Sequence, residues 1–176
     1  MSRPPISVGD VLPLTMSVPT SRMHLYNLDL VIGDIDSDIS IEFFTCSKCH
    51  LFACGLHEET GYGLSVLRLN NDDHDSWHAG VVVGDEYFVD ITGPTPIEDA
   101  IKKFSSNNDD EPASIEFYES DILTFYKSIN GGSPITDTDW WCNDGGFTFV
   151  AEYDGLVIGD VVRPFVSEFL KRYRWL

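Results

Sequence analysis

The sequence predicts an α+β fold in which one central helix packs on an antiparallel sheet and an amphipathic helix ends the chain. Three observations support this class. A helical pattern covers residues 47–60, two strand patterns flank a tight turn at Gly84-Asp85, and an amphipathic helical pattern covers residues 164–175. Because the first helix precedes hairpin-forming strands and does not alternate with single strands, the order is typical of α+β domains.

The central helix is expected from about Ser47 to Thr60. Thr45 or Ser47 offers a hydroxyl that could cap its N-terminus, and Gly61 fits the position after its last turn. Its apolar face is formed by Leu51, Phe52, Ala53 and Leu56. Acidic residues near its C-terminus oppose the helix dipole, so we expect tertiary packing to hold this helix more than its intrinsic propensity.

The strands of the sheet are expected around a hairpin. Alternating or continuous apolar runs predict strands at residues 23–32, 64–69, 77–83 and 86–91. Gly84-Asp85 is the turn between the last two of these. Residues 1–20 are expected to form an extended lead-in, and residues 39–44 a strand or a buried approach to the central helix.

The chain after the hairpin is expected to support this core. Thr92-Gly93-Pro94 should end the last strand, and a helix should run from Pro96 to Phe104 with Thr95 as its cap. Residues 105–112 are polar and acidic and predict a mobile loop.

Residues 113–176 follow with a strand-like start, a helix, a hairpin across Asp154-Gly155 and the last helix. This segment is short for a core of its own. Residues 1–176 are therefore expected to be a single domain with its core at residues 39–104.

The charge narrows the classes of partner. The chain has 11 basic and 29 acidic residues, a formal net charge of −18. Such a charge opposes direct binding to nucleic acid and to anionic membranes, and it is compatible with a basic partner. The sequence has no signal-like N-terminal segment and no apolar run of membrane-spanning length. We therefore expect a cytoplasmic protein with reduced thiols.

Cys49 is the first candidate for chemistry, because it lies at the expected start of the central helix. A thiol becomes a good nucleophile when positive charge or an imidazole favours its ionised form. His78 opens one strand of the hairpin, and Asp90 ends the other at almost the same distance from the turn. The two should lie opposite each other, within about one residue, and a cross-strand pair brings their Cβ atoms to ~5 Å. The sequence thus predicts a Cys-His-Asp triad.

The order of these motifs resembles a known superfamily. Cys49-His50-Leu51-Phe52-Ala53, then His78-Ala79-Gly80-Val81-Val82-Val83, then Tyr87-Phe88-Val89-Asp90 are similar to the papain-like and transglutaminase-like cysteine hydrolases, in particular to small phage and bacterial proteins of this type. The resemblance covers about residues 46–104.

The resemblance implies a papain-like or transglutaminase-like core and a thiol hydrolase or acyl transferase acting on an amide or ester bond. Cys49 would be the nucleophile, His78 the base and Asp90 its orienting group, without a cofactor. The substrate would be a protein or peptide, with a basic host protein as one candidate, in the host cytoplasm if the protein is phage-encoded.

One feature departs from the papain pattern, because the chain contains no glutamine. The oxyanion-stabilising glutamine of papain-like enzymes is therefore missing. Its role would fall to backbone N–H groups at Cys49 or His50, or to the side chain of Trp77 or Tyr62.

Two alternatives remain open at this stage. Cys46, Cys49, Cys54 and His57 form a set that zinc could accept in a structural site, although helical geometry spreads them around the axis. The other alternative is a catalytically inactive acidic protein, a phage-type inhibitor that blocks a basic or nucleic-acid-binding host protein. Its acidic clusters would be residues 34–38, 72–75 and 109–111.

Overall fold

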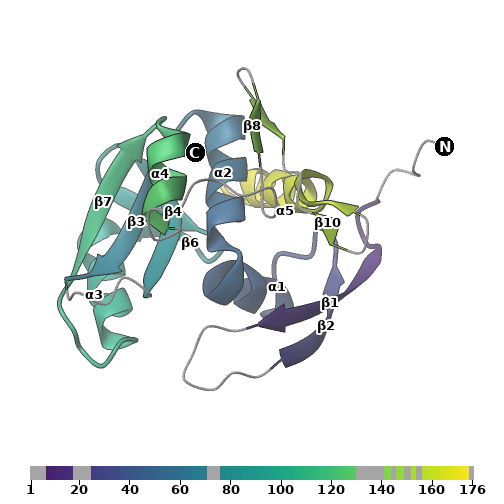
Figure 1. Ribbon diagram of the computed structural model, residues 1–176, viewed down its shortest axis with the longest axis horizontal. Coiled ribbons are helices and arrows are strands. Elements are labelled where there is room, and N and C mark those ends of the chain that lie inside the picture. The colour runs from purple at the N-terminus through teal and green to yellow at the C-terminus, as the bar shows by residue number, and fades with distance from the viewer. Residues whose placement is uncertain are drawn as a thin grey trace.

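The centre of the fold is a five-stranded antiparallel sheet with the strand order β6-β5-β4-β3-β7 (Figure 1). The computed structural model describes residues 7–17, 25–70, 76–129, 141–143, 146–148, 152–153 and 156–174. The strands of the sheet are β3 (Gly63–Leu69), β4 (Trp77–Val83), β5 (Tyr87–Asp90), β6 (Gly93–Pro96) and β7 (Ala113–Glu119). With the helices below, this gives the α+β class that the sequence predicts.

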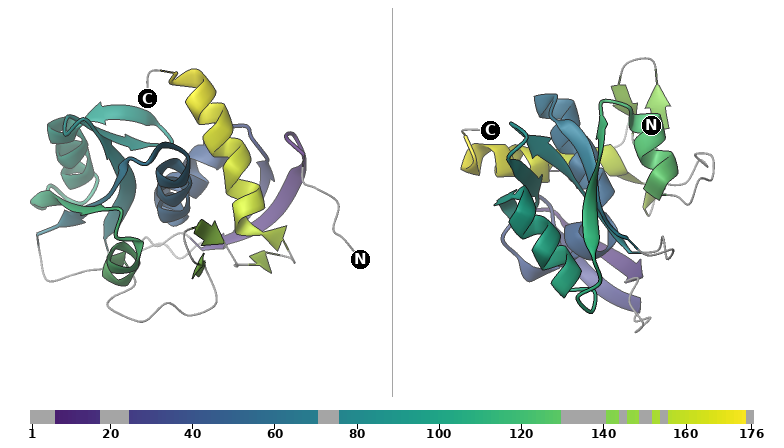
Figure 2. Two further views of the ribbon diagram at one scale, coloured as in Figure 1. Left: turned by 90° about the horizontal axis from the view of Figure 1, so that it is seen from above. Right: turned by 90° about the vertical axis from the view of Figure 1, so that its left-hand side faces the viewer.

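Helix α2 (Cys49–Thr60) packs on one face of the sheet, mainly against β4. Its residues 49–56 are all buried, because α5 (Ile158–Arg172) covers the side of α2 that faces away from the sheet (Figure 2). Gly55 makes this approach possible, since a Cβ atom there would lie only 2.8 Å from Val166 Cγ2. Helix α4 (Ile122–Ile129) contacts β3 and β7, and its Phe125 belongs to the same core cluster as α2.

The other face of the sheet carries α3 (Ile97–Ser106), which contacts β3, β5, β6 and β7. A smaller core lies beneath this helix. It consists of Leu67, Val82, Phe88 and Ala100, with Ile97, Ile101, Phe104 and Ile115 packed around it. The hairpin is therefore covered on both faces, which fits the apolar run of β4.

The chain enters α2 through helical turns and not through a strand. Helix α1 (Asp38–Glu42) is followed by η1, a π-helical turn over Phe43–Ser47. Of the two alternatives expected for residues 39–44, the strand is therefore wrong and the buried approach to the central helix is found, with Phe43 and Phe44 both buried. Ser37 caps α1 by accepting a hydrogen bond from the Ser40 N–H.

The ends of α2 agree with the sequence only in part. Gly61 ends the helix with φ 75°, the left-handed conformation that glycine adopts easily. The cap predicted for the N-terminus is wrong. Lys48 takes the N-cap position and makes no side-chain capping bond, while the Thr45 hydroxyl donates to the Ile41 carbonyl at 2.7 Å.

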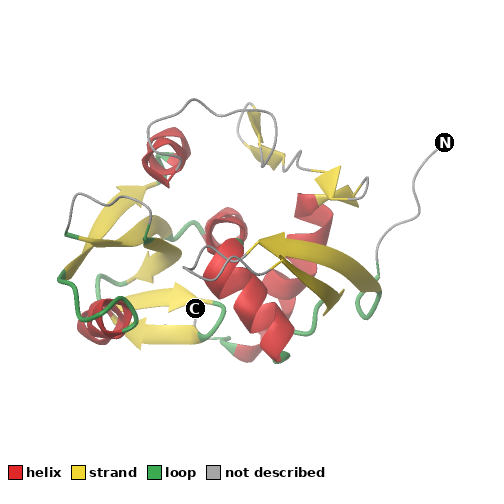
Figure 3. Cartoon of the chain, turned by 60° about the horizontal axis from the view of Figure 1, so that its bottom comes forward, coloured by secondary structure: helices red, strands yellow, loops and turns green. Residues whose placement is uncertain are grey.

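The remaining strands form small hairpins. β1 (Val11–Ser17) pairs with β2 (Leu25–Val31) and lies beside α1 and η1, on their side away from the large sheet (Figure 3). β8 (Trp141–Asn143) pairs with β9 (Gly146–Thr148), and β10 (Glu152–Tyr153) pairs with β11 (Leu156–Val157). The last pair corresponds to the hairpin predicted around Asp154-Gly155, whose turn lies outside the described residues.

Several boundaries after residue 91 differ from the prediction. Gly93–Pro96 does not end the sheet but forms its edge strand β6, where prolines are tolerated because one side of the strand is unpaired. Helix α3 begins at Ile97, without a side-chain cap from Thr95, and continues to Ser106. Helix α5 begins at Ile158, with Pro164 inside it.

The segment expected to be a mobile loop, residues 105–112, contains the end of α3 and a turn with internal hydrogen bonds. The Ser105 hydroxyl donates to the Glu111 carbonyl at 2.6 Å, and the Asp110 N–H donates to the Ser105 carbonyl at 3.1 Å. The strand after this turn, β7, pairs with β3. The core therefore extends beyond residue 104. The acidic cluster at residues 72–75 lies outside the described part of the chain.

Candidate active site

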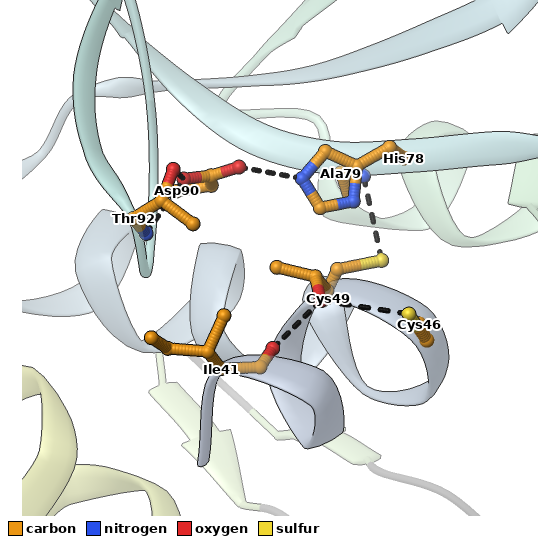
Figure 4. A network of polar contacts seen from close by, with 8 residues as sticks. Ile41, Cys46, Cys49, His78, Ala79, Asp90 and Thr92 are labelled. Carbon is orange, nitrogen blue, oxygen red and sulfur yellow. Dashed lines mark hydrogen bonds and ion pairs between the residues drawn. The ribbon is translucent and has the colours of Figure 1, made fainter. Parts of the chain in front are cut away.

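The thiol of Cys49 lies at the first residue of α2, where the helix meets the start of β4. The side chain is buried, with an exposed fraction of 4%. The backbone N–H of Ala79 donates to its Sγ at 3.5 Å (Figure 4). The junction between η1 and α2 at Lys48 aims this first residue at the sheet and not along the outer surface of the helix.

His78 and Asp90 are in direct contact in this region. His78 Nε2 lies 2.7 Å from Asp90 Oδ2. Because Asp90 engages Nε2, Nδ1 is the ring nitrogen left to face Cys49, whose side chain also hydrogen-bonds to His78. The two side chains are largely enclosed, with exposed fractions of 13% and 15%. The structure thus brings together the three residues of the predicted triad.

The strand register that joins them differs from the expected one. Val83 pairs with Tyr87 and Val81 pairs with Val89, so the turn has three residues instead of two. Continuing this register places Asp90 opposite Gly80 and not opposite His78. The histidine and the aspartate are diagonal neighbours on one face of the sheet, a separation that their side chains still span.

Gly80 is required in this arrangement. A Cβ atom at this position would lie 2.5 Å from Phe88 Cζ and 2.6 Å from the Val89 carbonyl oxygen. The space over Gly80 is thus filled by the ring of Phe88, which lies 5.8 Å from the ring of His78, measured between centroids. This packing limits the positions that the imidazole can take.

Asp90 is fixed by the turn that follows it. Its Oδ1 accepts hydrogen bonds from the Thr92 N–H at 2.8 Å and from the Thr92 hydroxyl at 2.6 Å. Burial alone would raise the pKa of Asp90, but the hydrogen bonds from His78 and Thr92 outweigh it and lower that pKa. Asp90 is therefore a carboxylate at neutral pH.

His78 carries the complementary charge. Burial alone would lower its pKa, but the hydrogen bonds to Asp90 and Cys49, together with their negative charge, raise the pKa to about 10. The imidazole is therefore protonated at neutral pH. The result is a buried cation held between a carboxylate and a sulfur atom.

A cavity of about 400 Å³ opens beside this pair, between α1–η1 and α3. Its sheet side is lined by Leu67, Trp77, His78, Phe88 and Asp90. Its helical walls are lined by Ile41, Thr45 and Cys46 on one side and by Ala100, Lys103, Phe104 and Asn107 on the other. Cys49 does not line the cavity, whereas its neighbour His78 does.

The residues His50, Trp77 and Tyr62, which were considered for an oxyanion site beside the backbone of Cys49, lie in different places. Trp77 lines the cavity. His50 is buried behind Trp77, with the two rings 5.7 Å apart, and burial followed by the charge of Lys48 lowers the pKa of His50 to about 3. Its Nδ1 has no hydrogen-bond partner among the described residues. Tyr62 follows the C-terminus of α2, at the opposite end of the helix from Cys49, and is therefore excluded from the site.

The structure does not assemble the zinc ligands of the alternative hypothesis. Within the described ranges, no three histidine, cysteine or acidic side chains are close enough to hold a metal ion. Cys46 is exposed, whereas Cys54 is buried in α2. His57 Nδ1 lies 2.5 Å from the Tyr62 carbonyl oxygen, at the C-terminal end of the helix.

Two parts of the site were missed by the sequence reasoning. Thr92 holds Asp90, and the Asp-x-Thr spacing, which is typical of a side-chain-stabilised turn, could have identified it. The wall formed by Lys103 and Asn107 could not have been found, because only the packing of α3 on the far face of the sheet brings these residues to the site.

Comparison with known proteins gave no match to a family model, to a curated protein or to a solved structure. Among the described residues, no helix combines the length and the apolar character needed to cross a membrane.

Proposed function

We propose that this protein is a cysteine-dependent hydrolase or acyl transferase that acts on an amide or ester bond, with a papain-like or transglutaminase-like core. The observation that carries the proposal is the His78–Asp90 pair, 2.7 Å apart, next to a thiol at the N-terminus of a buried helix. A nucleophile, a base and a group that orients the base are the parts that covalent acyl transfer requires.

The first half of the reaction follows from the charges of the site. The imidazolium of His78 stabilises negative charge on the Cys49 sulfur. The sulfur attacks the acyl carbon of the substrate, and the bond to the leaving amine or alcohol breaks. His78 donates its proton to that leaving group, and Asp90 holds the ring in position throughout.

The second half releases the acyl group. Neutral His78 takes a proton from water or from an amine, which attacks the thioester carbon. The carbon–sulfur bond breaks, the product leaves as an acid or an amide, and the imidazolium forms again. The Ala79 N–H, which contacts the sulfur, stabilises its negative charge when the thioester bond breaks.

The cavity is the proposed binding site for the acyl side of the substrate. Apolar groups such as Leu67, Phe88 and Phe104 line its inner part, and Lys103 and Asn107 lie toward the end of α3. This lining suits a peptide segment with an apolar side chain. Since Cys49 does not line the cavity, a local movement must expose its sulfur before it can meet a substrate.

The second candidate is a catalytically inactive acidic binding protein. The burial of Cys49 favours it, because a thiol with 4% exposure is inaccessible to a large substrate without this movement. The charge of −18 would then direct binding to a basic or nucleic-acid-binding partner.

A thiol-reactive probe distinguishes the two candidates. Wild-type protein is treated with a small electrophile such as a chloroacetamide at neutral pH, and the modified cysteine is identified by peptide mass spectrometry. We expect Cys49 to react faster than Cys54, which is also buried, and His78→Ala to slow the reaction of Cys49 by about tenfold or more.

Cys54→Ala is the matched control and should leave the labelling of Cys49 unchanged. Equal labelling rates for Cys49 and Cys54, or a labelling rate of Cys49 that does not depend on His78, would exclude Cys49 as an activated nucleophile. Either result would favour the catalytically inactive binding protein.

A further inference from the structure

A second thiol, that of Cys46, lies one turn before Cys49 and differs from it in environment. Cys46 is exposed and lines the cavity, whereas Cys49 is buried. The Thr45 hydroxyl lies 3.6 Å from the Cys46 sulfur. Figure 4 shows both sulfur atoms on the same side of the helical junction, below His78. The pair therefore combines an accessible thiol with a protected one.

The backbone between the two cysteines allows them to bond. Ser47 ends the π-helical turn, and Lys48 follows with φ −121° and ψ 29°. The third residue of a type I turn has φ and ψ near −90° and 0°, so Lys48 is about 30° from it in each angle, and a turn of this kind brings its first and fourth Cα atoms within about 7 Å. A disulfide needs Cα atoms about 4.4–6.8 Å apart. Cys54 lies a further turn along α2, with its side chain in the core, and does not share this turn.

We infer that Cys46 and Cys49 form a redox-active dithiol that exchanges with low-molecular-weight disulfides. The Cys46 sulfur attacks one sulfur of the small disulfide, whose S–S bond breaks and releases one thiol. The Cys49 sulfur then attacks the Cys46 sulfur and releases the second thiol. Two electrons and the two protons of the cysteine thiols pass to the small disulfide, which becomes two thiols.

The order of attack follows from exposure. An incoming disulfide in the cavity meets Cys46 first, because Cys49 does not line it. Cys49 then needs only to reach a sulfur within its own turn. In the oxidised form the Cys49 sulfur is bonded and cannot attack a substrate, so the dithiol would switch the enzyme off. This last consequence rests on the proposed function, whereas the exchange reaction does not.

The test uses glutathione disulfide with the full-length protein. Wild type, Cys46→Ser, Cys49→Ser and Cys54→Ala are treated with it, alkylated and digested, and the cysteine peptides are identified by mass spectrometry. We expect wild type and Cys54→Ala to form the Cys46–Cys49 disulfide, with dithiothreitol restoring both thiols. Cys49→Ser should accumulate the glutathione adduct on Cys46, because no sulfur remains to resolve it.

A stable glutathione adduct on Cys46 of the wild type, a disulfide of Cys46 with another cysteine, or no reaction would overturn the dithiol. Mass spectrometry needs no substrate, so this result is independent of the proposed function. If the dithiol forms and Cys49 of the reduced protein shows no selective reactivity, the proposed hydrolase fails while the redox pair stands.

Discussion

At the level of single residues, the charge state of His78 determines what the site can do. We predict that Asp90→Asn lowers the pKa of His78 from about 10 toward its ordinary value, because the largest stabilising contact of the imidazolium is lost. The measurement is a pH titration of the imidazole signals by NMR. The change should also lower any acyl-transfer rate by orders of magnitude, as expected when the orienting group of a triad is removed.

Asp85→Asn is the matched control. It makes the same chemical change in the turn between β4 and β5, where asparagine tolerates the positive φ of 57°. A His78 pKa that stays near 10 in Asp90→Asn would mean that the carboxylate does not hold the imidazolium.

The same pair should make the stability of the protein depend on pH. The folded-state pKa of His78 is raised, so its contribution is complete below about pH 6.5 and is lost as the pH rises through about 10. The pKa of Asp90 is lowered, so its contribution is complete above its ordinary pKa of 3.8 and is lost as the pH falls through the lowered value. Between these limits both contributions are present.

We therefore predict that the free energy of unfolding falls between pH 7 and pH 10 by more in the wild type than in His78→Gln. One pKa unit corresponds to about 1.4 kcal/mol, so the difference should be on the order of a few kcal/mol. Urea denaturation at the two pH values measures it. Equal losses in both proteins would mean that His78 is not the titrating group.

At the level of elements, the β4–β5 hairpin depends on a residue without a side chain. We predict that Gly80→Ala destabilises the protein by about 1–3 kcal/mol, because the added methyl group would collide with the Phe88 ring and with the Val89 backbone. Thermal or urea denaturation checks this. The displaced Phe88 should also shift the NMR signals of His78.

Gly63→Ala is the control in the neighbouring strand β3. A Cβ atom there would have its closest contact at 3.5 Å, an ordinary van der Waals distance. We expect little loss of stability. Equal losses of stability in the two variants would show that any glycine-to-alanine change in the sheet is destabilising, and that the contact with Phe88 is not the cause.

The sequence predicted the elements with clear signals. Periodicity and a glycine stop identified α2, and the apolar runs on both sides of Gly84-Asp85 identified β4 and β5. Residues 39–44 were left open between a strand and a buried approach to the central helix, because a short apolar run fits a strand or a buried helix equally well. The edge strand β6 was missed because its prolines suggest a strand end.

The sequence predicted which residues form the site, but not how the folded chain arranges them. Cys49, His78 and Asp90 were found from a helix start and the two ends of a hairpin. The strand register was off by one residue, because the turn contains one residue more than its Gly-Asp signal indicates. The cavity depends on where α3, α1 and η1 lie relative to the sheet, which no local pattern encodes.

At the level of the whole molecule, the last helix supports the turn that carries the site. Gly93 follows this turn with φ 111°, and a Cβ atom there would lie 2.5 Å from Tyr173 Oη. Tyr173 also packs on Phe169, with ring centroids 4.6 Å apart. The C-terminal end of α5 is thus in contact with the turn in which Thr92 holds Asp90.

We predict that Tyr173→Ala destabilises the protein by about 2–4 kcal/mol and broadens the NMR signals of His78, because the turn next to Gly93 loses its support. Tyr173→Phe keeps the ring and should retain most of the stability. Arg174→Ala, an exposed neighbour, is the control. Unchanged His78 signals in Tyr173→Ala would show that α5 has no influence on the site.

The burial of residues 49–56 of α2 has a consequence for the motions that give access to Cys49. A helix enclosed between the sheet and α5 opens only when much of the core opens, so its amide protons should exchange with solvent slowly, near the rate set by global unfolding. The turn η1 has an exposed outer side and should exchange faster. Lys48, where the helical geometry is interrupted, would then separate the slowly exchanging helix α2 from the faster-exchanging turn η1. Access to the sulfur would come from local opening of η1 while α2 stays folded.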